Sequence, residues 1–115
     1  MGRIYPLFSS SKGNSSFIGD KSGGILIDCG VSFKKLSQAL ELCEIPLEAV
    51  QGVFITHSHS DHVKGLKMLT KKIPVSVWGQ RETLDELLSE GLIFPGTEVN
   101  EITGAVCTAG MVVLS

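Results

Sequence analysis

The segment Val53-Phe54-Ile55-Thr56-His57-Ser58-His59-Ser60-Asp61-His62, residues 53–62, joins a short apolar run to a dense group of metal-binding residue types. The chain has three histidines, and all of them lie in this segment together with one carboxylate. Neutral imidazole and carboxylate are good zinc ligands, and a His-x-His pair that leaves a strand can point two rings at one ion. The segment therefore predicts a metal site at the end of a buried strand, where α/β sheets place their sites.

The predicted metal ligands are His57, His59, Asp61 and His62. Asp61 and His62 are adjacent, so their side chains diverge, which suits a second ion close to the first. Asp61 could instead cap a helix that begins at Val63. An expression tag would also gather histidines, but it would lie at a terminus and lack the flanking strand and helix.

Strand and helix signals alternate around this segment. Ile25-Leu26-Ile27 and Val53-Phe54-Ile55 are apolar runs of the kind found in strands that are buried on both faces. Apolar residues at helical spacing predict a helix that Ser32 caps and that runs to Glu44. Further strands are predicted over residues 3–8, 17–19, 24–28, 50–56, 75–78, 99–102 and 111–114, further helices over 63–72 and 81–90, and a polar loop over 9–16. This order predicts one α/β domain with helices packed on one face of a mixed sheet.

The residues 57–62 match the HxHxDH signature, and the chain thereby resembles the metallo-β-lactamase fold family. Upstream, Ile25-Leu26-Ile27-Asp28-Cys29-Gly30 resembles the family's LIDCG strand, in the usual order and spacing. The resemblance runs from about Ile4 to Gly91 and implies an αββα sandwich built from two halves. We expect residues 1–115 to be the N-terminal half of such a domain, because no histidine or aspartate after Asp85 matches the family's later ligands.

Asp28 is predicted to support the metal site without binding the ion. It ends a buried strand, where a carboxylate needs a partner. A hydrogen bond from a ligand histidine would satisfy it and would fix the tautomer of that ring. The resemblance implies the same role, and the alternative is a helix-cap or turn aspartate before Gly30.

The serine-rich stretch Ser9–Ser16, taken with residues 57–66, is similar to the YycJ-like (WalJ) branch of the family, which is linked to DNA exonuclease activity. The resemblance implies a metal-dependent hydrolase with two zinc ions, or manganese in their place, that acts on DNA or another phosphodiester. Asp61 would then orient or deprotonate the attacking water. Lys12, Asn14 and Ser15 offer a cation, hydroxyls and backbone amides to a phosphate, although such loops are more often turns.

Two alternatives to a nuclease stay open. The four ligands give two per ion, fewer than the three that zinc usually takes from a protein, so the chain alone is expected to bind metal weakly. A non-catalytic metal-binding or interaction module is therefore one alternative, and a thioester or lactone hydrolase of the same fold is the other. A homo-oligomer or a partner chain is expected to cover the sheet face that the second half would occupy.

Composition excludes few functions. The chain has 10 Lys and Arg against 12 Asp and Glu, a net charge of −2, so it has no overall attraction to nucleic acid, although local lysine pairs could supply one. Three widely spaced cysteines without a CxxC pair predict buried thiols in a reducing compartment. The absence of a signal-peptide pattern and of an apolar run of about 18 residues predicts a cytoplasmic protein that does not bind membranes.

Overall fold

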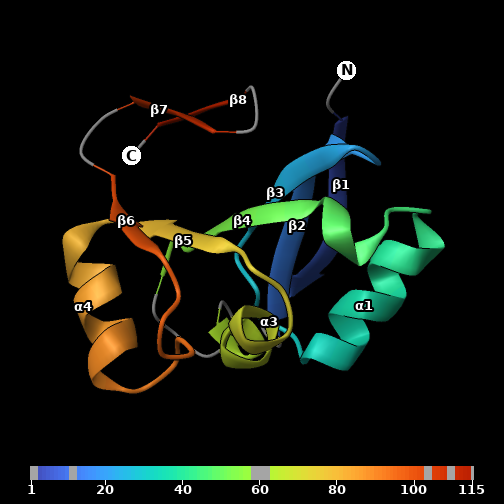
Figure 1. Cartoon of the computed structure of the whole chain (residues 1–115). Coiled ribbons are helices and arrows are strands. Elements are labelled where there is room, and N and C mark those ends of the chain that lie inside the picture. Colours follow the sequence, from blue (N-terminus) through green and yellow to red (C-terminus); the bar gives the residue numbers. More distant parts are fainter. Residues whose placement is uncertain (1–2, 11–12, 58–62, 103–104, 109–110, 115) are drawn as a thin grey trace.

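Figure 1 shows the computed structural model of the chain, which describes residues 3–10, 13–57, 63–102, 105–108 and 111–114. The strands are β1 (Arg3–Ser10), β2 (Gly13–Asp20), β3 (Gly23–Ile27), β4 (Val50–Phe54), β5 (Ser76–Gly79), β6 (Val99–Glu101), β7 (Ala105–Thr108) and β8 (Met111–Leu114). The helices are α1 (Phe33–Leu42), the 3-10 helix η1 (Leu47–Ala49), α3 (Leu66–Lys72) and α4 (Arg81–Ser89). None of these described helices combines the length and the apolar character that crossing a membrane requires.

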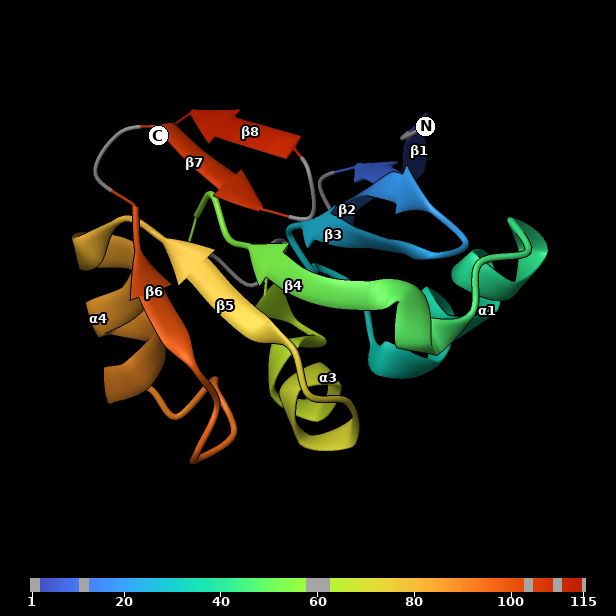
Figure 2. The same cartoon turned by 45° about the horizontal axis from the view of Figure 1, so that its top comes forward.

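Strands β1 to β6 form one sheet in chain order. The pairs β1–β2 and β2–β3 are antiparallel, whereas β3–β4, β4–β5 and β5–β6 are parallel. Each parallel pair is joined through a helix, and right-handed crossovers of one sense bring successive helices to the same face of a sheet. Figures 1 and 2 show α1, α3 and α4 on one side of the sheet and the β7–β8 hairpin on the other. The predicted mixed sheet with helices on one face is confirmed.

The core lies between the sheet and its helices. One row of paired side chains crosses all six strands and faces α1, α3 and α4: Tyr5, Phe17, Leu26, Val53, Val77 and Val99. The helices bury leucines against this row: Leu36, Leu40, Leu66, Leu69, Leu84 and Leu87. Burial of each large apolar side chain contributes about 1.5–3 kcal/mol to the stability of the fold. This apolar layer therefore holds the strands, and with them the strand ends, in place.

The other face of the sheet is also apolar. Side chains alternate along a strand, so the neighbours of the core row point away from the helices: Ile18, Ile25, Ile27, Phe54 and Trp78. Apart from Ile25, these side chains are half-buried, and Ile4 at the edge of the sheet is 71% exposed. A sheet that is apolar on both faces is typical of the inner layer of a sandwich.

The predicted polar loop over residues 9–16 is wrong. Ser9 pairs with Asn14 and Ser10 with Gly13, so β1 and β2 extend through most of the stretch. The inward positions of β2 there are occupied by the small residues Gly13 and Ser15, which allow a strand without an apolar pattern. The strand β7 was not predicted, and α3 begins at Leu66 rather than at residue 63. The cap at Ser32 is confirmed, because its Oγ accepts a hydrogen bond from the Lys35 N–H at 3.3 Å.

Candidate metal centre

The carboxyl ends of β3 and β4 lie side by side at one edge of the sheet. Asp28 directly follows β3, and Thr56 and His57 follow β4. The backbone pairing continues past both strands, because the Asp28 N–H donates to the Phe54 carbonyl at 2.8 Å and the Ile55 N–H to the Trp78 carbonyl at 2.9 Å. Parallel pairing therefore brings residues that are 28 positions apart in the sequence to the same place.

Asp28 is held from several directions. It is 5% exposed and has a φ of 64°, a left-handed conformation that aspartate tolerates better than most residues. Its Oδ1 accepts the Thr56 N–H at 2.8 Å, and its Oδ2 accepts the Thr56 hydroxyl at 2.6 Å. Its backbone carbonyl accepts the hydroxyl of Ser15 at 2.9 Å. The buried carboxylate is thus satisfied and has a fixed orientation.

His57 lies at the exposed end of this group. Its Nδ1 is 3.0 Å from the Thr56 Oγ1, so the described contacts run from Asp28 through Thr56 to the imidazole. Metal-binding histidines usually bond through one ring nitrogen to a partner that orients the other toward the ion. The residues present therefore fit a metal ligand at His57. Thr56 was not predicted as a site residue, because a threonine that follows a buried strand is not by itself a sign of a site.

Three of the four predicted ligands, His59, Asp61 and His62, lie outside the described residues, and so does Lys12. Among the residues that are described, no group of three or more His, Cys, Asp or Glu side chains is placed to hold a metal ion. The ligand set accordingly stays a prediction.

The chain on either side of residues 58–62 is attached to the same segment. On one side, the Thr56 N–H donates to the Asp28 carboxylate. On the other side, the Gly65 N–H donates to the Cys29 carbonyl at 2.9 Å. A Cβ on Gly65 would lie 2.2 Å from the Val31 carbonyl oxygen, so only glycine permits this approach. The stretch that carries the predicted ligands is thus anchored at both ends to the chain that follows β3.

Cys29 belongs to the packing beneath the site. Its side chain is 0% exposed, and burial, with the charge of Asp28 adding to it, raises the pKa of the thiol to about 12. The thiol is therefore neutral at ordinary pH and acts as a small apolar side chain. Cys29 is a buried free thiol, as predicted, whereas the unbridged Cys43 is only half-buried.

Two of the residues predicted to contact phosphate, Asn14 and Ser15, make hydrogen bonds within the protein. Ser15 is 1% exposed, and its hydroxyl proton goes to the Asp28 carbonyl. The carbonyl of Asn14 accepts the Gly30 N–H at 2.8 Å. Both residues tie β2 to the bend after β3, and phosphate contact by Lys12, Asn14 and Ser15 stays a prediction.

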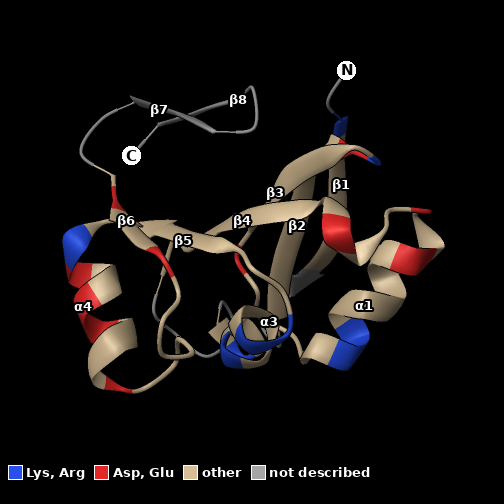
Figure 3. Ribbon diagram, in the orientation of Figure 1, with Lys and Arg blue, Asp and Glu red and all other residues tan. Residues whose placement is uncertain are grey.

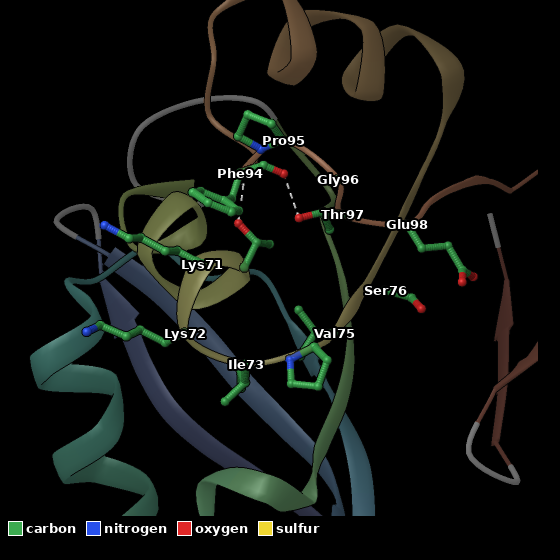
Figure 4. A pocket seen from close by; sticks show the side chains of 12 residues that line it. Lys71, Lys72, Ile73, Val75, Ser76, Phe94, Pro95, Gly96, Thr97 and Glu98 are labelled. Atoms are coloured by element: carbon green, nitrogen blue, oxygen red, sulfur yellow. Dashed lines mark hydrogen bonds between the residues drawn. The ribbon is translucent and has the colours of Figure 1, made fainter.

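A cavity of about 560 Å³ lies at the other edge of the sheet, by the amino ends of β5 and β6 (Figure 4). Two hydrogen bonds join residues of its wall: the Thr70 Oγ1 accepts the Phe94 N–H at 3.0 Å, and the Thr97 hydroxyl donates to the Phe94 carbonyl at 2.7 Å. In Figure 4 the side chains of Lys71 and Lys72 extend away from Thr97. None of the described residues that line this cavity is a histidine, and neither Asp28 nor His57 is among them.

Comparison with known proteins identifies the family. Residues 11–107 match the metallo-beta-lactamase superfamily. Over 77 residues, 67% of this chain and 29% of each relative, the chain is 35% identical to exodeoxyribonuclease YycJ of Bacillus anthracis and 32% identical to exodeoxyribonuclease WalJ of Streptococcus pneumoniae. The chain thus spans less than a third of the length of these relatives. The structure also superposes on native FEZ-1 metallo-beta-lactamase from Legionella gormanii with a TM-score of 0.78, at 18% identity, over 96% of this chain and 48% of that one. The chain belongs to the metallo-beta-lactamase superfamily, in the branch that includes YycJ and WalJ.

Proposed function

We propose that this chain carries the metal-binding half of a hydrolase that cleaves phosphodiesters, with DNA as the substrate of a YycJ-type exonuclease. The observation that carries the proposal is the oriented imidazole of His57 at the carboxyl end of β4, braced through Thr56 by the buried Asp28. The similarity to two exodeoxyribonucleases supports DNA as the substrate class.

The proposed ligands are His57, His59, Asp61 and His62, with zinc as the metal, two ions in a complete site, and manganese as the alternative. When bound, such ions polarise a phosphoryl oxygen and lower the pKa of a water molecule. In the proposal Asp61 would orient or deprotonate the attacking water, while Asp28 and Thr56 would hold the His57 ring in one orientation. The two anchors at Thr56 and Gly65 restrict where the ligand-bearing stretch can lie.

The charge distribution supports a polyanionic substrate. Lys34 and Lys35 lie in the first turn of α1, and α3 carries Lys67, Lys71 and Lys72. Helices α1 and α3 contact each other, and Figure 3 shows their lysines at the same end of the molecule, whereas α4 is mainly acidic. A local group of cations attracts the DNA backbone even when the net charge of the protein is slightly negative.

Hydrolysis assays test the proposal. The purified protein, loaded with zinc or manganese, is given end-labelled DNA and, separately, a thioester, beside the variant His57→Ala. We expect metal-dependent release of nucleotides from DNA that His57→Ala abolishes. Hydrolysis of the thioester alone would contradict the nuclease assignment. Metal binding without any hydrolysis would favour the non-catalytic module.

The apolar outer face of the sheet gives the interaction module a specific basis. Phe54, Trp78 and Ile18 are half-buried on the face away from the helices, and Ile4 is exposed beside them. We propose that a second copy or a partner chain packs on this face. Light scattering after size exclusion measures the mass: a dimer that Ile4→Lys converts to a monomer would support self-association, and a monomeric parent protein would contradict it.

A further inference from the structure

Thr56 stands between a carboxylate and an imidazole. Its hydroxyl oxygen is 2.6 Å from the Asp28 Oδ2 and 3.0 Å from the His57 Nδ1. The Thr56 hydroxyl thus connects the buried Asp28 to the exposed His57. The direction of each hydrogen bond follows from which atoms can donate.

A hydroxyl has a single proton, and an ionised carboxylate can only accept. The Thr56 proton therefore goes to the Asp28 Oδ2. The contact between the Thr56 oxygen and the His57 Nδ1 then requires the proton to be on Nδ1. In a neutral imidazole this places the lone pair on Nε2.

We propose that Thr56 is a positioning residue that sets the tautomer of His57 and so selects Nε2 as the nitrogen that meets a metal ion. The role in metal binding rests on the proposed function, but the tautomer is a property of the metal-free protein. The preference acts before any ion arrives, so the ring needs neither to lose a proton from Nε2 nor to turn over when a metal binds.

The hydrogen bonds can run only from His57 through Thr56 to Asp28, because the Asp28 carboxylate is held in one orientation. The Thr56 N–H occupies Oδ1 at 2.8 Å, which fixes Oδ2 toward the hydroxyl. The Asp28 backbone is held on both sides, since its N–H donates to the Phe54 carbonyl and its carbonyl accepts from Ser15. A residue that is 5% exposed and bonded in this way presents its acceptor in one place.

The variant Asp28→Asn is predicted to reverse the tautomer. The backbone N–H of Thr56 needs an acceptor, so the amide oxygen takes the place of Oδ1 and the amide NH₂ takes the place of Oδ2. The NH₂ then donates to the Thr56 oxygen, and the hydroxyl proton turns to His57. The Nδ1 becomes the acceptor, and the proton moves to Nε2. Replacing one carboxylate oxygen of Asp28 by an amide nitrogen of similar size is therefore predicted to move the imidazole proton from Nδ1 to Nε2.

Nitrogen-15 NMR of the imidazole tests this proposal in the metal-free 115-residue protein, at about pH 8.5, where histidine is ordinarily neutral. The His57 signals are assigned by their loss in His57→Gln. We expect protonated Nδ1 in the parent protein and in Thr56→Ser, protonated Nε2 in Asp28→Asn, and a loss of the Nδ1 preference in Thr56→Val. Amide spectra of the β-sheet check that each variant folds.

A parent protein with protonated Nε2 would overturn the proposal, even if every variant failed to fold. An Nδ1 preference that Thr56→Val leaves unchanged would overturn it as well. Zinc affinity is a second readout: a lost orienting contact typically costs roughly ten- to a hundredfold in affinity, so Thr56→Val should weaken binding and Thr56→Ser should not. A correct tautomer without zinc binding would leave the proposal standing and would contradict only the proposed function.

Discussion

The two edges of the sheet differ in what they offer to a ligand. At the carboxyl ends of β3 and β4, three polar side chains from segments that are far apart in sequence converge through hydrogen bonds of 2.6–3.0 Å. At the amino ends of β5 and β6, a cavity of about 560 Å³ is lined by prolines, short polar residues and two lysines, among others. Two of its side chains, Thr70 and Thr97, bond to the backbone of Phe94 in the same cavity wall.

The two edges differ in convergence: among the described residues, only the carboxyl edge joins side chains from separate segments around a buried carboxylate. A buried carboxylate costs free energy unless it is bonded, so Asp28 with its partners is an arrangement that folding must maintain. The described residues around the cavity include no buried carboxylate whose free-energy cost must be offset. Substitutions there should therefore be tolerated. The predictions below set matched substitutions at the two edges against each other.

Gly65→Ala should have the largest effect on stability. Its Cβ would lie 2.2 Å from the Val31 carbonyl oxygen, a backbone atom that cannot move alone. Overpacking of this kind typically costs 1–3 kcal/mol, and we expect about 3 kcal/mol here. Urea unfolding followed by circular dichroism measures the change.

Gly96→Ala, at the cavity edge, is the matched control. Gly96 has a φ of 93°, but no atom lies within 4 Å of an added Cβ. Only the backbone strain remains, about 1 kcal/mol. Equal losses in the two variants would show that the close approach of Gly65 to residue 31 does not matter.

Asp28→Ala should cost about 2 kcal/mol, because it leaves the Thr56 N–H and hydroxyl without their acceptors. Asp28→Asn should cost less, since its amide can still bond to both groups. Thermal and urea unfolding of the two variants give the comparison. A loss in Asp28→Ala no larger than in Asp28→Asn would contradict the described contacts.

The stability of the fold should fall as the pH rises above 9. Burial raises the pKa of Cys29 from an ordinary value of 9.0 to about 12 in the folded protein. Below pH 9 the thiol is protonated in both states, and its full contribution is present. Between about pH 9 and 12 the unfolded chain releases the proton while the folded chain keeps it, so stability is lost, by about 1 kcal/mol at pH 10.

Unfolding measurements at pH 8 and pH 10 on the parent protein and on Cys29→Ala isolate this effect. The other titrating groups are shared, so only the difference between the two proteins reports on Cys29. The parent protein should lose more stability than the variant over this interval. Parallel losses would mean that the thiol of Cys29 is not desolvated in the folded state.

Lys71→Ala and Lys72→Ala should have the smallest effects. Both lysines are exposed in the last turn of α3, where a cation interacts favourably with the helix dipole. Each variant should lose about 0.5 kcal/mol of stability and keep the zinc affinity of the parent protein. A weakened zinc affinity would link the cavity edge to the metal site and remove the distinction between the two edges.

The sequence was sufficient to predict the parts of the fold that local patterns encode. The apolar runs 25–27 and 53–55 predicted two central strands, and leucines at helical spacing predicted the helices α1 and α4. The stretch Ser9–Ser16 was predicted wrongly as a loop, because polar residues carry no strand pattern when their order comes from pairing with another strand. The short strand β7, residues 105–108, was not predicted although it contains the β-branched residues Val106 and Thr108.

Local sequence motifs also underlie the prediction of the candidate site. The pair of motifs placed Asp28 and His57 in one site, and the structure brings both to the same sheet edge. Thr56 could not be predicted as their link, because a single threonine after a strand is common and its role depends on parallel pairing of β3 with β4. That Thr56 lies between Asp28 and His57 follows from the tertiary structure and not from a local pattern.

Zinc binding tests the account most directly. The affinity of the parent protein, of His57→Ala and of Lys71→Ala is measured by competition with a chromophoric chelator, and the bound metal is counted by mass spectrometry. The account predicts that the parent protein and Lys71→Ala bind zinc alike and that His57→Ala binds it at least about tenfold more weakly. No zinc uptake by the parent protein, or uptake that His57→Ala leaves unchanged, would contradict a metal site at the carboxyl edge of the sheet.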